Sequence, residues 1–375
     1  MFKPIISADS HVCEPPDLFV DRIDKKYLAD APRVVHDPER GDVYQIKGVK
    51  KPLPLSLISA AGQPPEQLST KGARFEELHR GGWDPAARLL DQDRDGVAAE
   101  IIYPSVGMEV CNLADQDYKK ACMDAYNLWI AEFCDPAPQR LIGLGQTPLR
   151  SIDEGIADLR RIKALGLRGV MLPGRPGIPD VDYDHTMFDP FWQAAIDLEL
   201  PLSFHILTSG EMKGLQFRGT SINSGYAIIR ANQDIMSMFV NSGVFMRNPK
   251  LKIVCVEADA GWVPHFVYRL DHTYNRHRFR LRGVELDKMP SEYFLENIYL
   301  TFQDDIVAFT MMHAMNPRRI MWANDFPHSD STWPWSQELL QKYVAPLPQE
   351  QQDMLLHDNV AELYNLESGL GRAAA

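Results

Sequence analysis

Side chains that can bind a metal ion or move protons stand at the ends of several short apolar runs. Asp9 and His11 follow the first run, and later runs end at His205, Glu257 and Asp325. Imidazole nitrogens and carboxylate oxygens are common ligands of zinc, iron and manganese. Because Asp9 and His11 are two positions apart, an extended chain points both side chains the same way. If the run ends meet in space, they predict a divalent-metal site.

Each of these residues also has a purely structural explanation. A histidine at a strand end is more often hydrogen-bonded within the fold than bound to a metal. Asp325 suits a turn or a helix cap, and Glu257 suits a helix N-cap. The coincidence of such residues at four separate runs is what favours the metal site.

The apolar runs alternate with amphipathic stretches, which is typical of βα units. The predicted strands are 4–8, 97–103, 141–144, 169–172, 202–204, 253–256, 297–302 and 319–323. The predicted helices are 117–133, 151–165, 188–198, 226–242, 261–275 and 304–315. This order predicts an α/β fold, a (β/α)8 barrel of the TIM type, in which all strand carboxyl ends share one face. A doubly wound open sheet is the alternative, although no glycine-rich phosphate loop follows the first strand.

The 375 residues are expected to form a single domain, 1–375, with long loop insertions after strands 1 and 5. The first insertion, 12–84, is rich in Pro and Gly, and the second, 207–225, is rich in Gly, Ser and Thr. Loops of this length are usually lids or binding loops. Residues 366–375 are expected to be a flexible tail.

The composition excludes some classes of protein. There are 39 Lys and Arg against 51 Asp and Glu, a net charge of −12, which argues against nucleic acid as a partner. No apolar run approaches the roughly 20 residues that span a bilayer, and the N-terminus does not resemble a signal peptide. The five cysteines are scattered and predict reduced thiols. We therefore expect a cytoplasmic protein that has no membrane partner.

Several segments together resemble the amidohydrolase superfamily, in the branch of aminocarboxymuconate-semialdehyde decarboxylase and the aromatic-acid decarboxylases. The resemblance covers nearly the whole chain, and its order and spacing make it specific. The segments are Asp9–Pro15, Trp83–Val97, Glu257–Pro264, Trp322–His328 and Asp358–Tyr364.

This resemblance implies a catalytic divalent metal held by His11, His205 and Asp325, with Asp9 as a fourth ligand. Zinc is the first expectation, with iron or manganese as alternatives. The predicted fourth strand has no lysine to be carbamylated, which favours one ion, and a second ion stays open if Glu257 or Glu14 bridges it.

The resemblance also suggests the reaction. Aromatic-acid decarboxylases of this branch carry a catalytic histidine where this chain has Glu257. We therefore expect a hydrolase that acts on a small carboxylated cyclic or aromatic substrate through a metal-activated water. Asp325 would accept a proton, and Glu257 or His328 would pass it on, unless His328 only orients Asp325. The alternative is non-oxidative decarboxylation of an aromatic or muconate-type acid, and the third is a non-catalytic metal-binding protein.

Other residues are expected near the substrate. Arg218 and Arg230 are candidates for binding its carboxylate, since Arg pairs with carboxylates in bidentate fashion. Trp262 and Trp333 could form the wall of an apolar pocket. Glu14 could support the site or only bind backbone. The resemblance implies a homo-oligomer, a dimer or tetramer.

Overall fold

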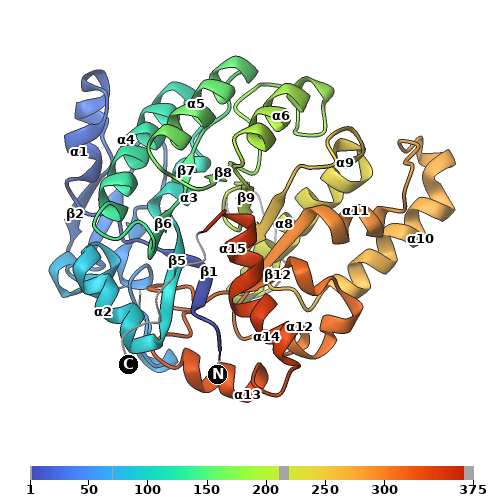
Figure 1. Ribbon diagram of the computed structural model, residues 1–375. Coiled ribbons are helices and arrows are strands. Elements are labelled where there is room, and N and C mark those ends of the chain that lie inside the picture. The colour runs from blue at the N-terminus through green and yellow to red at the C-terminus, as the bar shows by residue number, and fades with distance from the viewer. Residues whose placement is uncertain (1, 70, 211–218, 367–375) are drawn as a thin grey trace.

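The computed structural model describes residues 2–69, 71–210 and 219–366 (Figure 1). Its parallel strands correspond to the eight predicted runs, the third of which is interrupted at Leu144. These strands are β1 (Ile5–His11), β5 (Val97–Tyr103), β6 (Leu141–Gly143), β7 (Gly145–Gln146), β8 (Val170–Met171), β9 (Leu202–His205), β10 (Ile253–Val256), β11 (Ile298–Phe302) and β12 (Ile320–Trp322). Every residue of these strands is buried, as expected when helices cover a parallel sheet.

The strands lie in two parallel sheets whose order follows the sequence. One sheet has the order β1-β5-β6, and the other has the order β7-β8-β9-β10-β11-β12. Within the described residues no strand ladder joins β12 to β1. Two backbone hydrogen bonds connect β1 with the segment after β12, where the strands of a closed barrel would pair. They run from Asp325 N to Asp9 O at 3.1 Å and from His11 N to Phe326 O at 2.6 Å. The parallel α/β arrangement is confirmed, whereas a continuously paired barrel is not observed.

Helices surround the strands, as Figure 1 shows. The predicted helices are present with shifted ends, and α10 extends to Leu281, beyond the predicted end at residue 275. The α-helices are α1 (Leu18–Arg22), α2 (Pro85–Asp95), α3 (Val106–Cys111), α4 (Gln116–Cys134), α5 (Ile152–Ala164), α6 (Asp189–Asp197), α8 (Ser224–Asn241), α9 (Val244–Arg247), α10 (Val263–Leu281), α11 (Pro290–Asn297), α12 (Ile306–Met311), α13 (Ser336–Tyr343), α14 (Gln349–Asp353) and α15 (Asn359–Leu363). Ser151 caps α5 by accepting a hydrogen bond from the Glu154 amide at 3.2 Å.

The segment between β1 and α2 contains a small antiparallel sheet. Its strands are β2 (Arg33–Asp37), β3 (Gly41–Gln45) and β4 (Leu53–Pro54), paired in that order. Tyr44 of β3 is fully buried and donates hydrogen bonds to the carbonyls of Glu14 and Pro15. These bonds attach the sheet to the chain just after β1. A lid role for 12–84 stays a prediction, and residues 211–218 of the second insertion and 367–375 of the tail lie outside the described residues.

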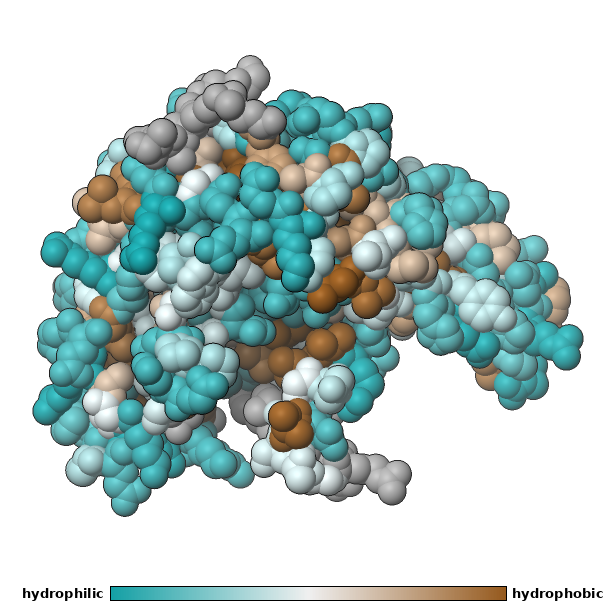
Figure 2. All heavy atoms as spheres, turned by 90° about the horizontal axis from the view of Figure 1, so that it is seen from below, coloured by the Kyte–Doolittle hydropathy of each residue, from teal (hydrophilic) through white to brown (hydrophobic). Residues whose placement is uncertain are grey.

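The outer face of the molecule is uneven. Figure 2 shows a hollowed face with apolar side chains near its centre and an arm projecting on the right, where Figure 1 places α10. Over the described ranges, no helix combines the length and apolar character that a bilayer span needs. All five cysteines are free and buried, in agreement with the prediction of reduced thiols.

Candidate metal centre

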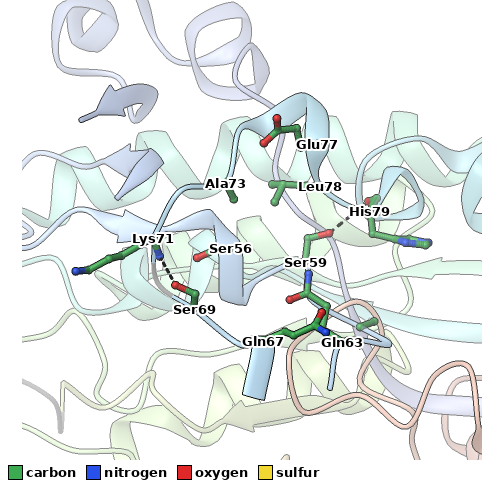
Figure 3. Close-up of a pocket in the computed structure, with 11 residues that line it drawn as sticks. Ser56, Ser59, Gln63, Gln67, Ser69, Lys71, Ala73, Glu77, Leu78 and His79 are labelled. Atoms are coloured by element: carbon green, nitrogen blue, oxygen red, sulfur yellow. Dashed lines mark hydrogen bonds between the residues drawn. The ribbon is translucent and has the colours of Figure 1, made fainter. Parts of the chain in front are cut away.

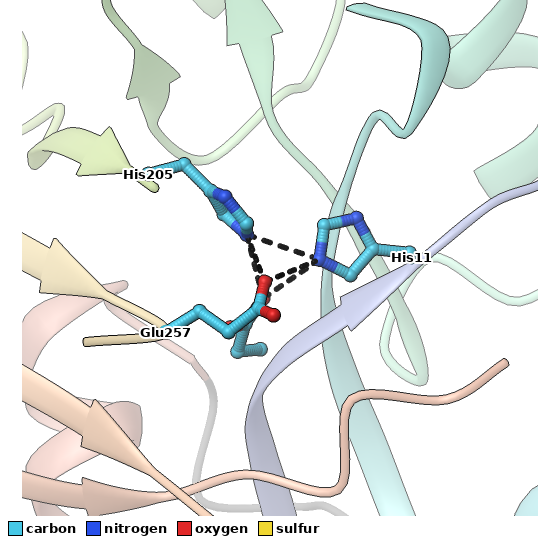
Figure 4. Close-up of side chains that lie close together, drawn as sticks. His11, His205 and Glu257 are labelled. Carbon is cyan, nitrogen blue, oxygen red and sulfur yellow. Dashed lines mark hydrogen bonds and ion pairs between the residues drawn. The ribbon is translucent and has the colours of Figure 1, made fainter. Parts of the chain in front are cut away.

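The carboxyl ends of four parallel strands bring the predicted ligands together. Asp9 and His11 lie at the carboxyl end of β1, and His205 is the final residue of β9. Glu257 directly follows β10. Asp325 comes three residues after the end of β12. Figure 4 shows His11, His205 and Glu257 pointing toward one another from three separate strands. The parallel topology therefore gathers residues that are up to 316 positions apart in sequence, from Asp9 to Asp325.

The donor atoms lie within reach of a single ion. His11 Nε2 is 3.4 Å from Asp9 Oδ1 and 3.4 Å from Asp325 Oδ1. His205 Nε2 is 3.1 Å from Glu257 Oε2 and 3.8 Å from Asp9 Oδ1. Asp9, His11, His205 and Glu257 form one group whose donor atoms all lie within 4.8 Å of one another.

The hydrogen bonds of the two histidines test whether a cation fits. His11 Nδ1 is 3.1 Å from the Pro104 carbonyl, and His205 Nδ1 is 3.0 Å from the Ile206 carbonyl. A carbonyl only accepts, so each Nδ1 carries the proton and each Nε2 presents a lone pair. The two Nε2 atoms nevertheless lie 3.1 Å apart. Two facing lone pairs repel unless a cation lies between them, so the donor set fits a divalent metal.

The buried carboxylates lead to the same conclusion. Asp325 is fully buried, and among the described residues neither of its carboxylate oxygens has a hydrogen-bond partner, nor does Asp9 Oδ1. Burial and the nearby Asp9 raise the pKa of Asp325, and burial and Asp325 raise the pKa of Glu257. Burial lowers the pKa of His11 to about 4, whereas on His205 the effect of burial is outweighed by Asp9 and Glu257, which raise its pKa; without a metal, His205 is the ring that carries positive charge against these carboxylates. A bound cation would remove the repulsion among the three carboxylates.

The ring of His328 lies next to Asp325, and contacts with its neighbours fix its orientation. Its ring stacks on His11 with the centroids 3.8 Å apart, and its Nδ1 is 3.2 Å from Asp325 Oδ1. Ser105 Oγ donates to the Val12 carbonyl at 2.7 Å and lies 2.8 Å from His328 Nε2. Because the single hydroxyl proton goes to Val12, His328 Nε2 must donate to Ser105. His328 Nδ1 then faces Asp325 and is placed to exchange a proton with it.

We predict that Ser105→Ala lowers kcat by about 10–100-fold with little change in KM, because His328 loses the partner that orients it. Steady-state kinetics of the metal-loaded enzyme would measure this split. Ser105→Thr keeps the hydroxyl and should recover most of the activity. A kcat for Ser105→Ala equal to that of the parent enzyme would contradict the role of Ser105.

Glu14 and Arg88 hold the loops around the centre. The buried carboxylate of Glu14 accepts hydrogen bonds from the amides of Val106 and Gly107, just after Ser105, so Glu14 binds backbone. Arg88 is completely buried and pairs with Glu100 at 2.5 Å.

Arg88 also contacts the backbone on both sides of the centre. Its Nη1 donates to the His11 carbonyl at 2.6 Å, and its Nη2 is 3.4 Å from the Phe326 carbonyl. The guanidinium lies 4.6 Å from the centre of the Phe326 ring. One side chain thus ties the ligand-bearing end of β1 to the loop after β12.

A cavity of about 350 Å³ opens beside the centre. Asp9 and Glu257 lie in its wall, next to apolar side chains such as Ile229 and Phe302. A space of this size suits a small-molecule ligand. The cavity gives the metal centre an accessible side, as a catalytic rather than a purely structural site requires.

The predicted substrate residues lie elsewhere. Arg230 is exposed on α8 and is not part of the cavity wall, and Arg218 lies outside the described residues. The indole of Trp262 donates to the carbonyls of Ala258 and Asp259 and packs against Phe266. These contacts support the turn after β10.

Trp333 is also absent from the cavity wall. It is buried against Phe326 and donates from its indole to the Asp91 carbonyl. Trp333 therefore packs beneath the loop that carries Asp325.

A second cavity of about 370 Å³ lies in the segment between β4 and α2. Figure 3 shows mainly short polar side chains around it, including Ser56, Ser59 and Gln67. The ring of His79 is held by Asp91 at 2.8 Å. Neither group of metal-ligating side chains found among the described residues includes a residue of this wall.

Comparison with known proteins agrees with this geometry. A model of the amidohydrolase family matches residues 76–366. The chain belongs to the amidohydrolase family. The resemblance inferred from the motifs is therefore confirmed, and so, at family level, is the prediction of a hydrolase- or decarboxylase-type enzyme.

Two curated relatives of this amidohydrolase are decarboxylases. Gamma-resorcylate decarboxylase of Rhodococcus jostii (strain RHA1) is 24% identical over 53% of the chain and 64% of that enzyme. The chain thus matches less than two thirds of the Rhodococcus enzyme. The 2-amino-3-carboxymuconate-6-semialdehyde decarboxylase of Dictyostelium discoideum is 26% identical over 70% of the chain and 71% of that enzyme.

Solved structures share the fold. An amidohydrolase of Mycobacterium avium subsp. paratuberculosis has a TM-score of 0.79 and 21% identity, and the match covers 97% of this chain and 100% of that one. A dihydroxybenzoic acid decarboxylase of Polaromonas sp. JS666, solved with manganese and 2-nitroresorcinol, has a TM-score of 0.63 and 17% identity over 97% of each chain. These neighbours support a TIM-barrel-like α/β fold for this amidohydrolase.

Two residues next to the ligands were missed from the sequence. Ser105 follows β5 directly, so the rule that selected Asp9 and His205 also applies to Ser105. Serine is not a typical metal ligand, so a search for ligands alone does not select it. Arg88 begins a buried polar stripe on α2 with Gln92 and Asp95, at helical spacing. That stripe is a signal in the sequence, although the partner Glu100 is visible only in the fold.

Proposed function

We propose that this protein is a metal-dependent decarboxylase that releases CO2 from an aromatic or muconate-type acid. The observation that carries the proposal is the donor set of Asp9, His11, His205 and Asp325 beside a cavity of about 350 Å³, whose wall includes Asp9. The two curated relatives, named as decarboxylases, favour this reaction over the hydrolysis expected from the sequence.

A divalent ion in this centre would hold the substrate carboxylate and stabilise negative charge that develops on the neighbouring oxygen. The side chains around it have separate roles. His11 and His205 are held by carbonyls at Nδ1, which aims each Nε2 at the ion. Asp325 holds a proton for the substrate, and His328 replaces it through Nδ1, 3.2 Å away.

The reaction consumes one proton from solvent and needs no other reactant. The bond between the substrate carbon and its carboxylate breaks, and the electron pair stays on that carbon. A proton from Asp325 forms the new C–H bond, and CO2 leaves. A proton from solvent then reaches Asp325 through His328 Nδ1, while His328 Nε2 keeps its contact with Ser105.

The test is incubation of the manganese- or zinc-loaded enzyme with 2,6-dihydroxybenzoate and related acids in D2O containing H2(18)O. We expect release of CO2 and one deuterium at the carbon that carried the carboxylate. Incorporation of 18O into an organic product without CO2 release would overturn the proposal in favour of hydrolysis.

Hydrolysis remains the second candidate because of one residue. Glu257 lies in the cavity wall with Oε2 3.1 Å from His205 Nε2, where the decarboxylases that this chain resembles carry a catalytic histidine. A carboxylate there could accept a proton from an attacking water. Glu257→Gln separates the two reactions, since it would abolish hydrolysis while leaving the Asp325 proton transfer in place.

One ion per chain is the proposed stoichiometry, with zinc or manganese as the occupant. The two groups of donors, one with Asp9 and His205 and the other with Asp325 and His328, share His11 and Glu257. This overlap supports a single shared centre. Two metal equivalents per chain in elemental analysis would instead indicate that Glu257 bridges two ions.

We further propose a homo-oligomer, a dimer or tetramer, with α10 in the contact. Tyr268, Phe279 and Leu281 are 59%, 81% and 56% exposed on this one helix, which projects from the body in Figure 1. Exposed apolar groups of this size are typical of interfaces. Light scattering should give a multiple of 42.6 kDa, and Phe279→Glu should lower it. A mass of 42.6 kDa for the parent protein would refute this assembly.

A further inference from the structure

The segment 324–336, which carries Asp325 and His328, has both of its ends against one buried carboxylate. That carboxylate belongs to Asp95, the last residue of α2, which is fully buried. Asp95 Oδ2 accepts a hydrogen bond from Ser336 Oγ at 2.6 Å, and Asp95 Oδ1 accepts one from Ser336 N at 3.2 Å. Asn324 Nδ2 donates to Asp95 Oδ2 at 3.3 Å. One side chain of α2 therefore holds the first and the last residue of the segment.

Asn324 extends this contact to the metal centre. Its Oδ1 accepts a hydrogen bond from the amide of Phe326 at 3.3 Å, so its backbone and side chain contact the residues on both sides of Asp325. Its own amide donates to Ser7 Oγ at 2.9 Å, and Ser7 Oγ lies 2.9 Å from the carbonyl oxygen of Asp9. A path of hydrogen bonds thus runs from the end of α2 to the backbone of two predicted ligands.

The backbone of Asp325 depends on such support. Its φ is 52°, in the left-handed region that is costly for residues other than glycine. A conformation of this kind persists only where the surrounding contacts impose it. The carbonyl of Asn324 also accepts hydrogen bonds from Ser331 Oγ at 2.7 Å and from Thr332 N at 3.0 Å. The contacts at the base of the segment therefore hold Asp325 in a conformation that it would otherwise leave.

The burial of Asp95 indicates what its carboxylate is needed for. Burial raises its pKa to about 7, and the hydrogen bonds from Ser336 and Asn324 act in the opposite direction. A buried carboxylate costs free energy that an apolar side chain in the same place would not. The three hydrogen bonds from the ends of segment 324–336 offset this cost.

We propose that Asp95 is a positioning residue, which holds segment 324–336 at both ends so that Asp325 faces His328 and the metal centre. Asp325 Oδ1 lies 3.2 Å from His328 Nδ1 and 3.4 Å from His11 Nε2, and a shift of the segment would change both distances. The catalytic consequence rests on the proposed function, because it takes Asp325 and His328 as the residues that transfer the proton.

The first test is hydrogen exchange of the parent protein and of Asp95→Asn, measured above the pKa of Asp95. The substitution replaces one acceptor oxygen with an N–H donor, which faces the donors of Ser336 or Asn324. We expect the amides of His328 and Thr332, which are hydrogen-bonded within the segment, to exchange about tenfold faster or more, with those of β10 unchanged.

Asp93→Asn is the matched control on the same helix. Asp93 pairs with Arg140 at 2.8 Å, and Asp93 is partly exposed. This variant should exchange like the parent protein. If Asp95→Asn does not fold, Ser336→Ala decides the question, because it removes one of the three hydrogen bonds and should accelerate the same amides to a smaller degree. Exchange that is unchanged in the segment, or equally faster throughout the chain, would overturn the proposal.

The second test is steady-state kinetics of the metal-loaded enzyme. Asp95→Asn should lower kcat by about 10–100-fold and change KM by less than about threefold, with Ser336→Ala between it and the parent enzyme. Faster exchange in the segment without CO2 release from any acid would leave the positioning role standing and reject the decarboxylase. CO2 release with an unchanged kcat in Asp95→Asn would support the decarboxylase and reject the positioning role.

Discussion

Replacing His205 or Asp325 with alanine is expected to abolish both metal binding and turnover. Each residue supplies a donor atom that no neighbour replaces, and the stabilisation a metal gives a transition state is several kcal/mol. A loss of that size corresponds to a fall of about 10³-fold or more in kcat. Elemental analysis should find less than a tenth of an equivalent of metal in either variant, and the CO2 assay should show the loss of turnover.

The control for these variants is His313→Ala, which removes an exposed histidine and should leave metal content and kcat unchanged. Thermal unfolding gives an independent measurement. A chelator should lower the melting temperature of the parent protein, because a ligand that binds only the folded state stabilises it. The same chelator should not change that of Asp325→Ala. Full activity in either ligand variant would refute the assigned centre.

Replacing Arg88 with methionine is expected to lower the free energy of unfolding by about 3–5 kcal/mol. The change leaves Glu100, which is 1% exposed, as an uncompensated buried charge. It also removes the hydrogen bond to the His11 carbonyl, so metal affinity should fall as well. Urea unfolding and a metal titration would measure the two effects.

A surface ion pair provides the comparison. Arg22 and Glu132 are 2.6 Å apart, and Glu132 is 61% exposed. Arg22→Met should cost less than about 1 kcal/mol, since exposed pairs contribute little. The double change of Arg88→Met with Glu100→Leu should recover part of the stability, because no buried charge remains. A cost for Arg88→Met as small as that for Arg22→Met would show that Arg88 does not hold the two loops.

The sequence by itself indicated the parallel α/β arrangement and the side chains that gather at the candidate metal centre. Both depend on local pattern, because apolar runs become strands and the residue after a run must emerge at the carboxyl end. The convergence of Asp9, His11, His205 and Asp325 could therefore be expected from the sequence, and their role as ligands stays a prediction. The same rule could have included Ser105, had hydroxyls been considered along with metal ligands.

Only the tertiary structure decided how these residues act together. The 3.1 Å approach of the two Nε2 atoms, the contact of Ser105 with His328 and the pairing of Arg88 with Glu100 join distant parts of the chain. Their distances depend on how the strands and helices pack, which no local pattern encodes. The cavity is a further example, because its acidic wall is assembled from turns after different strands. The chemistry that a single residue type can perform is evident from the sequence. The pairing of buried charges and the shape of the cavity arise only when the chain folds.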